Sequence, residues 1–205
     1  MKIQTAEFVT TVGLDGRLPI TQLPQIALVG RSNVGKSTLI NALAHLKIAR
    51  AGGAPGTTRL LNVYRIQLAS NRGELLLIDL PGYGYARGGS AASRGFDRVT
   101  ERFFHPERRE APDRPGHTGP AGAILLVDAR HPGLESDRDA LVWLRELELP
   151  LVVAATKVDR LKPSARRAAL RAHETALGQT VLPISAKLGD GLPAFWRVLL
   201  ELADA

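Results

Sequence analysis

Residues 30–37 are Gly30-Arg31-Ser32-Asn33-Val34-Gly35-Lys36-Ser37, and they match the pattern G-x-x-x-x-G-K-[ST] at every fixed position. Gly30 and Gly35 allow a tight backbone turn in which successive N–H groups point at phosphate oxygens. Lys36 can reach the β- and γ-phosphates of a nucleotide, and the hydroxyl of Ser37 can bind Mg2+. The pattern therefore predicts a phosphate-binding loop, but it does not say which nucleotide the loop binds.

The residues on either side of this loop fit the same interpretation. The run Ile26-Ala27-Leu28-Val29 is short and apolar, which is typical of a buried strand. Residues 38–47 indicate a helix whose N-terminal dipole favours bound phosphate. A glycine-rich turn without a ligand is the alternative, and the complete match to the pattern argues against it.

Apolar runs and helical patterns alternate along the chain, as in a parallel sheet covered by helices. The expected strands are 26–29, 61–68, 74–78, 123–127, 151–155 and 181–184, and the expected helices are 36–46, 96–104, 135–147, 164–177 and 193–203. Residues 70–73 are short enough to join two strands as a hairpin, so one edge should be antiparallel. We predict an α/β fold of the P-loop NTPase class, with three α/β/α layers and a six-stranded, mostly parallel sheet that has one antiparallel edge strand.

Length and composition predict one domain over residues 1–205, with a core from about 24 to 203. The absence of cysteine excludes disulfides and thiolate metal sites. No apolar run approaches the roughly 20 residues of a membrane span. We therefore expect a monomeric cytoplasmic protein that does not enter a membrane. Residues 105–120 are rich in Pro, Gly and charge and predict a surface loop.

Positive charge is concentrated in one part of the chain. The whole sequence has a net charge of +7, but residues 16–73 contain no Asp or Glu. The basic residues of that segment give it a net charge of +8 and leave −1 for the remainder; they are Arg17, Arg31, Lys36, Lys47, Arg50, Arg59, Arg65 and Arg72. Because one nucleotide does not need eight cations, this segment favours a nucleic-acid partner over a merely solvated basic face. For a second basic group, residues 160–171, a solvated helix face is the favoured interpretation.

Three further motifs follow predicted strands. Asp79-Leu80-Pro81-Gly82 places a carboxylate that can bind Mg2+ through water and a Gly82 N–H that can donate to a γ-phosphate. In Thr156-Lys157-Val158-Asp159, the Asp159 carboxylate can accept hydrogen bonds from N1–H and the 2-amino group of guanine. Ser185-Ala186-Lys187 can supply N–H groups to the guanine O6. Adenine lacks this pair of donors, so the set predicts guanine specificity.

Taken together, these motifs resemble those of the translation-factor-like (TRAFAC class) GTPases. More narrowly, the chain resembles the EngB (YihA/YsxC) family of bacterial GTPases, which is linked to assembly of the large ribosomal subunit. The resemblance runs from about Phe8 to the C-terminus. The segments that carry it are residues 30–37, Pro55-Gly56-Thr57-Thr58, Asp79-Leu80-Pro81-Gly82-Tyr83-Gly84-Tyr85-Ala86, Asp128-Ala129-Arg130-His131-Pro132 and residues 156–159.

The resemblance implies roles for individual residues. Ser37 and Thr58 would be direct Mg2+ ligands, Asp79 would act in the second shell, and Thr57 is the alternative to Thr58 if the register differs by one. Lys36, Thr58 and Gly82 would be the catalytic residues. The nucleotide-binding set would be Gly30, Arg31, Ser32, Asn33, Val34, Gly35, Lys36, Ser37, Thr38, Gly56, Thr57, Thr58, Arg59, Leu60, Asp79, Leu80, Pro81, Gly82, Thr156, Lys157, Val158, Asp159, Ser185, Ala186 and Lys187.

Hydrolysis of GTP to GDP and phosphate should be slow. Many GTPases have a Gln after D-x-x-G that orients the attacking water, and Tyr83 stands at that position here. The missing contribution could come from the ribosomal particle. It could also come from K+, because Asn33 stands where some related GTPases hold this ion beside the phosphates, although a loop-stabilising amide is an equal alternative.

The resemblance implies a GTP-controlled switch in assembly of the large ribosomal subunit, with ribosomal RNA and ribosomal proteins as partners. GTP would order residues 49–59 and 83–95 into a binding surface. A cell-division or septation GTPase that acts through protein partners is the alternative. An ATPase or small-molecule kinase is a further alternative, against which Asp159 and residues 185–187 argue.

Overall fold

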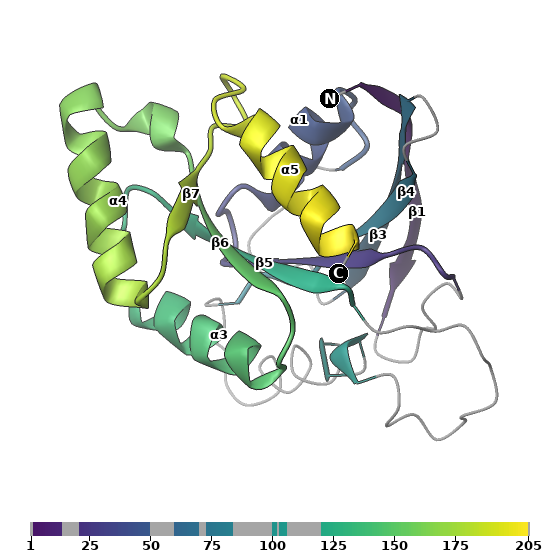
Figure 1. Cartoon of the computed structure of the whole chain (residues 1–205), viewed down its shortest axis with the longest axis horizontal. Coiled ribbons are helices and arrows are strands. Elements are labelled where there is room, and N and C mark those ends of the chain that lie inside the picture. The colour runs from purple at the N-terminus through teal and green to yellow at the C-terminus, as the bar shows by residue number, and fades with distance from the viewer. Residues whose placement is uncertain are drawn as a thin grey trace.

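The computed structural model describes residues 2–13, 21–49, 60–69, 73–83, 100–101, 103–105 and 120–204. In these residues one sheet has the strand order β1-β3-β4-β2-β5-β6-β7 (Figure 1). The strands are β1 (Ile3–Val12), β2 (Gln25–Gly30), β3 (Leu61–Leu68), β4 (Glu74–Asp79), β5 (Gly122–Asp128), β6 (Leu151–Thr156) and β7 (Val181–Pro183). The helices are α1 (Lys36–Ala44), α3 (Glu135–Glu146), α4 (Pro163–Leu177), α5 (Leu192–Ala203) and the short 3-10 turn η3 (Val158–Arg160).

The direction of the strands confirms a mostly parallel sheet. β4, β2, β5, β6 and β7 run parallel to one another, so their carboxyl ends lie along one edge of the sheet. β3 is antiparallel to β4, as the predicted hairpin requires. Because ligands of such sheets bind outside the carboxyl ends of the strands, this edge is where a nucleotide site is expected.

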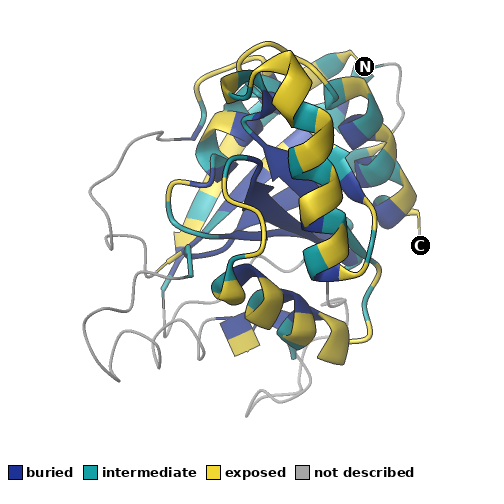
Figure 2. Ribbon diagram, turned by 90° about the vertical axis from the view of Figure 1, so that its left-hand side faces the viewer, coloured by how far each residue is buried: buried dark blue, intermediate teal, exposed yellow. Residues whose placement is uncertain are grey.

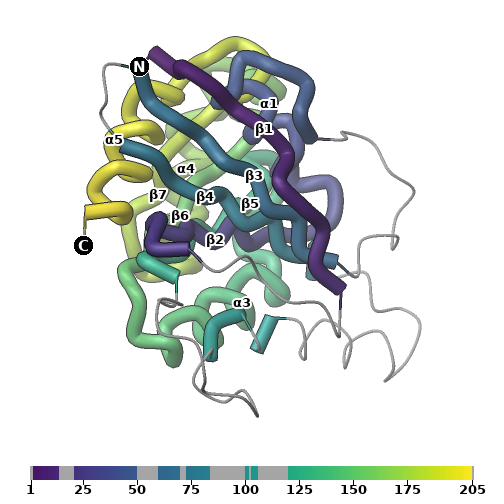
Figure 3. Tube along the Cα trace, turned by 90° about the vertical axis from the view of Figure 1, so that its right-hand side faces the viewer, coloured from purple at the N-terminus to yellow at the C-terminus, as the bar shows by residue number. Residues whose placement is uncertain are grey.

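The predicted number of six strands is wrong, because β1 adds a seventh strand at the edge (Figure 3). β1 is antiparallel to β3, so β3 is not the edge strand. The sequence of β1 lacks a clean alternation of apolar and polar residues. The pairing of β1 with β3 is irregular at two places, between Ile3 and Thr5 and between Phe8 and Thr10. At each place the regular alternation of side chains between the two faces of the sheet is interrupted.

Helices cover both faces of the sheet in three layers. α3 and α4 contribute to one apolar cluster, in which Leu141, Leu144 and Leu177 are buried against strand residues. α1 and α5 contribute to the second cluster on the other face. Figure 2 shows the buried sheet between helices whose outer faces are exposed. Each fully buried Leu or Phe side chain contributes about 1.5–3 kcal/mol to stability relative to an exposed one.

The sequence pattern of α5 shows why this element forms. Phe195, Trp196, Leu199 and Leu202 recur at helical spacing, and all are buried. Gly191 begins the helix at a positive φ of 76°, and an added Cβ there would lie 2.1 Å from the carbonyl oxygen of Pro183. Only glycine fits this turn from β7 into α5.

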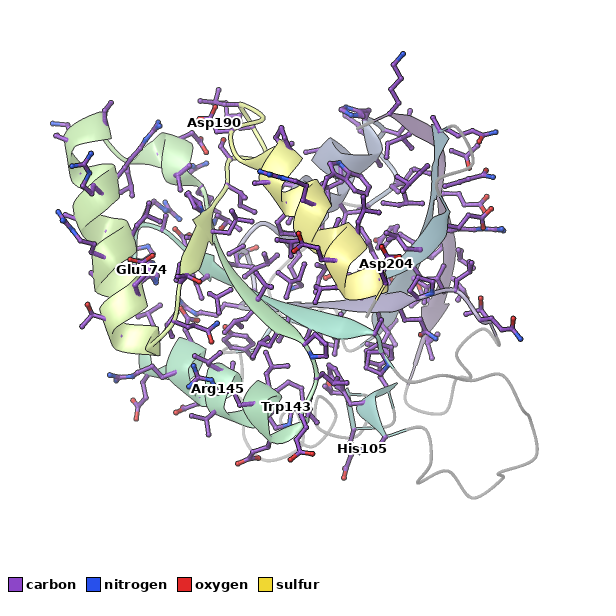
Figure 4. The ribbon with its side chains drawn as sticks, in the orientation of Figure 1. His105, Trp143, Arg145, Glu174, Asp190 and Asp204 are labelled. Carbon is purple, nitrogen blue, oxygen red and sulfur yellow. The ribbon has the colours of Figure 1, made fainter. Side chains whose placement is uncertain are left out.

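The expected helices agree with the structure to within two residues at most where they are described. The first ends at Ala44 rather than residue 46, because His45 adopts a left-handed conformation with φ 53°. In the expected helix 96–104, residues 100–101 and 103–104 are helical, and Phe104 contacts Trp143 of α3 edge to face (Figure 4). The other residues of that helix, most of the predicted 49–59 and 105–120 loops, and residues 84–95 lie outside the described residues.

Candidate nucleotide-binding site

The loop between β2 and α1 has the tight backbone that its glycines predict. A Cβ on Gly30 would lie 2.8 Å from both the Leu126 carbonyl oxygen and Cγ1 of Val34. Asn33 and Gly35 both have positive φ, at 62° and 115°. These left-handed residues turn the chain so that it enters α1 directly.

The first turn of α1 leaves its backbone N–H groups available for a ligand. No side chain caps the helix at Gly35, and no acidic residue lies in its first turn. A helix N-terminus of this kind binds anions through N–H groups and through its dipole. The geometry is what a phosphate-binding loop requires.

Lys36 lies beside this loop. Its ammonium donates to the carbonyl oxygen of Gly30 at 3.2 Å and lies 3.9 Å from Oδ1 of Asp79. Burial lowers the pKa of Lys36, and the Asp79 carboxylate opposes that effect. The ammonium is therefore placed between the loop and the end of β4.

Asp79 fits the role of a carboxylate that holds Mg2+ through water. Burial raises its pKa to about 6 despite the opposing charge of Lys36, and its Oδ1 is buried without a hydrogen-bond partner among the described residues. In that part of the chain no cluster of three or more His, Cys, Asp or Glu side chains could hold a metal. Mg2+ bound to a nucleotide keeps waters and takes few protein ligands, so Ser37 and an Asp79 carboxylate oxygen without a hydrogen-bond donor suit it.

The D-x-x-G segment lies directly against the phosphate loop. The carbonyl oxygen of Tyr83 accepts a hydrogen bond from the N–H of Ser32 at 3.3 Å, and Tyr83 forms an isolated bridge with Arg31. A Cβ on Gly82 would lie 2.5 Å from the Ser32 nitrogen, so only glycine fits. The hydroxyl of Tyr83 donates to Oδ1 of Asp137 at 2.9 Å, in α3.

Thr156 and Lys157, at the end of β6, form hydrogen bonds with the phosphate loop that follows β2. Oγ1 of Thr156 donates to the carbonyl oxygen of Val34 at 2.7 Å, with a second contact to that of Val127 at 3.1 Å. The ammonium of Lys157 donates to the carbonyl oxygen of Asn33 and lies 2.9 Å from Oδ2 of Asp128. These contacts join the end of β6 to the backbone of the loop after β2, although 122 residues separate Thr156 from Val34.

Asp128, at the end of β5, joins Lys157 and Arg130. Burial would raise the pKa of Asp128, but hydrogen bonds from Arg130 and Lys157 outweigh it and hold this pKa well below its usual value. The guanidinium of Arg130 donates to both carboxylate oxygens, at 2.9 and 2.7 Å. The charged carboxylate fixes the Lys157 stem in place.

The side chains of Asp159 and Ser185 lie next to each other. The hydroxyl of Ser185 donates to Oδ1 of Asp159 at 2.7 Å and accepts from the N–H of Leu188 at 3.1 Å. Among the described residues, no acceptor is found for the N–H of Ala186 or Lys187. The carboxylate and these N–H groups therefore have the chemistry to bind one edge of a purine base.

Not every expected site residue is placed by the structure. Gly56, Thr57, Thr58 and Arg59 lie outside the described residues, and Leu60 stands exposed just before β3. Sequence reasoning left Asp128, Arg130 and Asp137 out of the site. A signal existed for Asp128, because it follows the strand that neighbours β6; Asp137 gave none, because an acidic residue in the first turn of a helix is ordinary.

Comparisons with known proteins identify relatives of this chain. Residues 25–157 match the family described as 50S ribosome-binding GTPase. The chain is 38% identical over 204 residues to the probable GTP-binding protein EngB of Pelotomaculum thermopropionicum, with 97% of this chain and 96% of the relative covered. It is 39% identical over 211 residues to the protein of the same description from Anaeromyxobacter sp. strain K, covering 99% and 93% of the two chains.

Solved structures show the same likeness. A crystal structure of a probable GTP-binding protein EngB matches with a TM-score of 0.60 and 25% identity, over 88% of this chain and 98% of that chain. The G domain of the T. maritima FeoB iron transporter matches with a TM-score of 0.58 and 26% identity, over 88% and 98%. None of the described helices in the present chain is long and apolar enough to cross a bilayer.

The fold and its motifs thus define a GTPase of the P-loop class. Within that class, the curated relatives match almost the whole length of the chain, which identifies the family. The chain belongs to the EngB family of GTP-binding proteins.

Proposed function

We propose that this GTPase is a nucleotide-controlled switch in the assembly of the large ribosomal subunit. The observation that carries the proposal is the match of residues 25–157 to a family described as 50S ribosome-binding GTPase. The net charge of +8 over residues 16–73 supports it, because ribosomal RNA is a polyanion that attracts such a segment. GTP would create the ribosome-binding surface, and hydrolysis would release the protein into the cytoplasm.

In this proposal the described residues bind the nucleotide at both ends. The N–H groups of Gly35, Lys36 and Ser37 and the Lys36 ammonium bind the phosphates, while Asp159 and the N–H groups of Ala186 and Lys187 bind guanine. Mg2+ would be held by Ser37, by Asp79 through water and by Thr58, and it would supply positive charge that offsets the negative charge of the phosphates. Lys36 and the Gly82 N–H stabilise the charge that develops on the γ-phosphate.

Slow intrinsic hydrolysis is proposed from the position of Tyr83. The Tyr83 hydroxyl donates to Asp137 in α3, so the side chain is directed away from the phosphate loop, beside which water would attack the γ-phosphate. Burial and the Asp137 carboxylate also raise the pKa of Tyr83 far above its usual value, so the hydroxyl cannot act as a base. The remaining stabilisation would come from the ribosomal particle or from K+.

The K+ proposal rests on Asn33. Asn33 has a left-handed backbone conformation, and its carbonyl oxygen accepts a hydrogen bond from the Lys157 ammonium. The residue itself is exposed within the phosphate-binding loop. Turnover of GTP in KCl and in NaCl at equal ionic strength tests the idea. Faster turnover in KCl supports it, and equal rates remove K+ from the account.

Co-sedimentation with purified ribosomal subunits tests the proposed function. We expect the protein to pellet with large subunits in a non-hydrolysable GTP analogue and to remain in the supernatant in GDP. The binding should weaken as salt rises, because phosphate contacts release counterions. Failure to bind large subunits with the analogue, together with capture by purified division proteins, would favour a septation role instead.

A further inference from the structure

The hydrogen bond between Tyr83 and Asp137 joins two segments that are 54 residues apart in the sequence. Asp137 lies in the first turn of α3, and its side chain is almost wholly buried, with 1% of the residue exposed. Its Oδ1 accepts from the Tyr83 hydroxyl at 2.9 Å. Its Oδ2 is buried and has no partner among the described residues.

A carboxylate in this environment does not serve stability. Burial raises the pKa of Asp137, and the Tyr83 hydrogen bond and the charge of Arg31 only partly oppose that effect. Glu135, in the same helical turn, already provides an exposed acid for the helix dipole. A buried charge with one unpaired oxygen is unfavourable, which indicates that Asp137 has another use.

The backbone of Tyr83 is held at the same time by the phosphate loop. Its carbonyl oxygen accepts from the N–H of Ser32, and its strand-like bridge to Arg31 fixes the direction of the chain. Gly82, one residue earlier, has no room for even a methyl group beside Ser32. Tyr83 is therefore anchored from both sides, by its backbone on the loop and by its ring hydroxyl on α3.

We propose that Asp137 is a positioning residue that holds Tyr83, and through it Gly82, in place to meet the γ-phosphate of GTP. The inference rests on the proposed role of Gly82 as a γ-phosphate donor. With the anchor intact, the Gly82 N–H is ordered before GTP binds. Without it, GTP binding has to order this segment and loses affinity, whereas GDP has no γ-phosphate and is bound as before.

The measurement is the affinity for a non-hydrolysable GTP analogue divided by the affinity for GDP. Tyr83→Phe removes the donor and keeps the ring, and Asp137→Leu removes the acceptor and keeps the approximate shape. We expect each to lower this ratio by about tenfold to a hundredfold, as for loss of one hydrogen bond to a charged group. The double variant should show no further loss, because both changes remove the same contact.

Two further variants separate positioning from stability. Asp137→Asn keeps an acceptor oxygen for Tyr83 and should restore most of the ratio. Arg145→Ala is the matched control on α3, because it removes the contacts of Arg145 with Leu177 and Gln179 at α4 without touching Tyr83 (Figure 4). It should lower the melting temperature and leave the ratio unchanged.

The outcomes distinguish this proposal from the one on which it rests. If Tyr83→Phe and Asp137→Leu both leave the ratio at its wild-type value, the anchoring role of Asp137 is wrong, whatever the role of Gly82. If the wild-type protein binds the GTP analogue and GDP but Gly82→Ala leaves the ratio unchanged, the role of Gly82 is itself wrong. Additive losses in the double variant would also overturn the proposal.

Discussion

Replacement of Asp159 by Asn tests the assignment of guanine. Ser185 holds Oδ1 of Asp159 at 2.7 Å, so the carboxylate is already oriented, and it can accept from both the N1–H and the 2-amino group of the base. Asn keeps one acceptor oxygen and puts an NH2 group against a guanine donor. Hydrogen bonds to charged groups are worth about 1.5–3 kcal/mol each, so loss of one of the two predicts a fall in GDP affinity of about tenfold to a hundredfold.

Titration with fluorescent GDP and xanthosine diphosphate measures this change. Xanthine carries an oxygen in place of the 2-amino group, so Asp159→Asn should gain affinity for it as it loses affinity for guanine. Asp190→Asn is the matched control, because it makes the same change on a neighbouring exposed acid whose carboxylate only approaches Arg166, at 4.0 Å (Figure 4). GDP affinity in Asp159→Asn within about threefold of wild type, without a gain for xanthine, would refute the assignment.

Three other perturbations have defined outcomes. Thr156→Val removes the hydroxyl that donates to the Val34 carbonyl oxygen and should lower the free energy of unfolding, measured in urea, by about 1–3 kcal/mol. GDP affinity should fall as well. Unchanged GDP affinity would show that this hydrogen bond does not shape the phosphate loop. Asn41→Ala breaks two hydrogen bonds of 2.8 Å to the backbone of Ala49. It should lower the free energy of unfolding by about 1–3 kcal/mol. An unchanged midpoint of urea unfolding would contradict this prediction. Because the pKa of Asp137 is raised on folding, its contribution to stability is largest at acid pH and is lost as pH rises through that pKa. Asp137→Asn should therefore be more stable than wild type at neutral pH. The difference should shrink as pH falls through the raised pKa and reach its minimum at about pH 4, the unfolded value; a difference independent of pH would be inconsistent with a buried charge.

The parts of the fold that the sequence predicts are those with strong local patterns. The glycines of the phosphate loop and the continuous apolar runs of β2 and β5 define their elements without help from the rest of the chain. β1 is different, because most of its residues are exposed and its register with β3 shifts twice. An edge strand of this kind is stabilised by pairing with β3, which no local pattern reveals.

The same distinction applies to the site. Asp159 and Ser185 belong to recognisable motifs, and the structure brings the Ser185 hydroxyl to 2.7 Å from the Asp159 carboxylate. Asp137 belongs to no motif, and its meaning comes only from the ring of Tyr83 that reaches it across the fold. Residues 56–59 remain predictions, since they lie outside the described residues.

The proposed control of ribosome binding by GTP is tested most directly through thermodynamic linkage. The quantity to measure is the affinity of the protein for a non-hydrolysable GTP analogue and for GDP, each with and without saturating large ribosomal subunits. If GTP favours ribosome binding by some factor, the subunits must raise analogue affinity relative to GDP by the same factor, for which we expect about fivefold or more. An analogue-to-GDP ratio that large subunits leave unchanged would contradict a nucleotide-controlled switch.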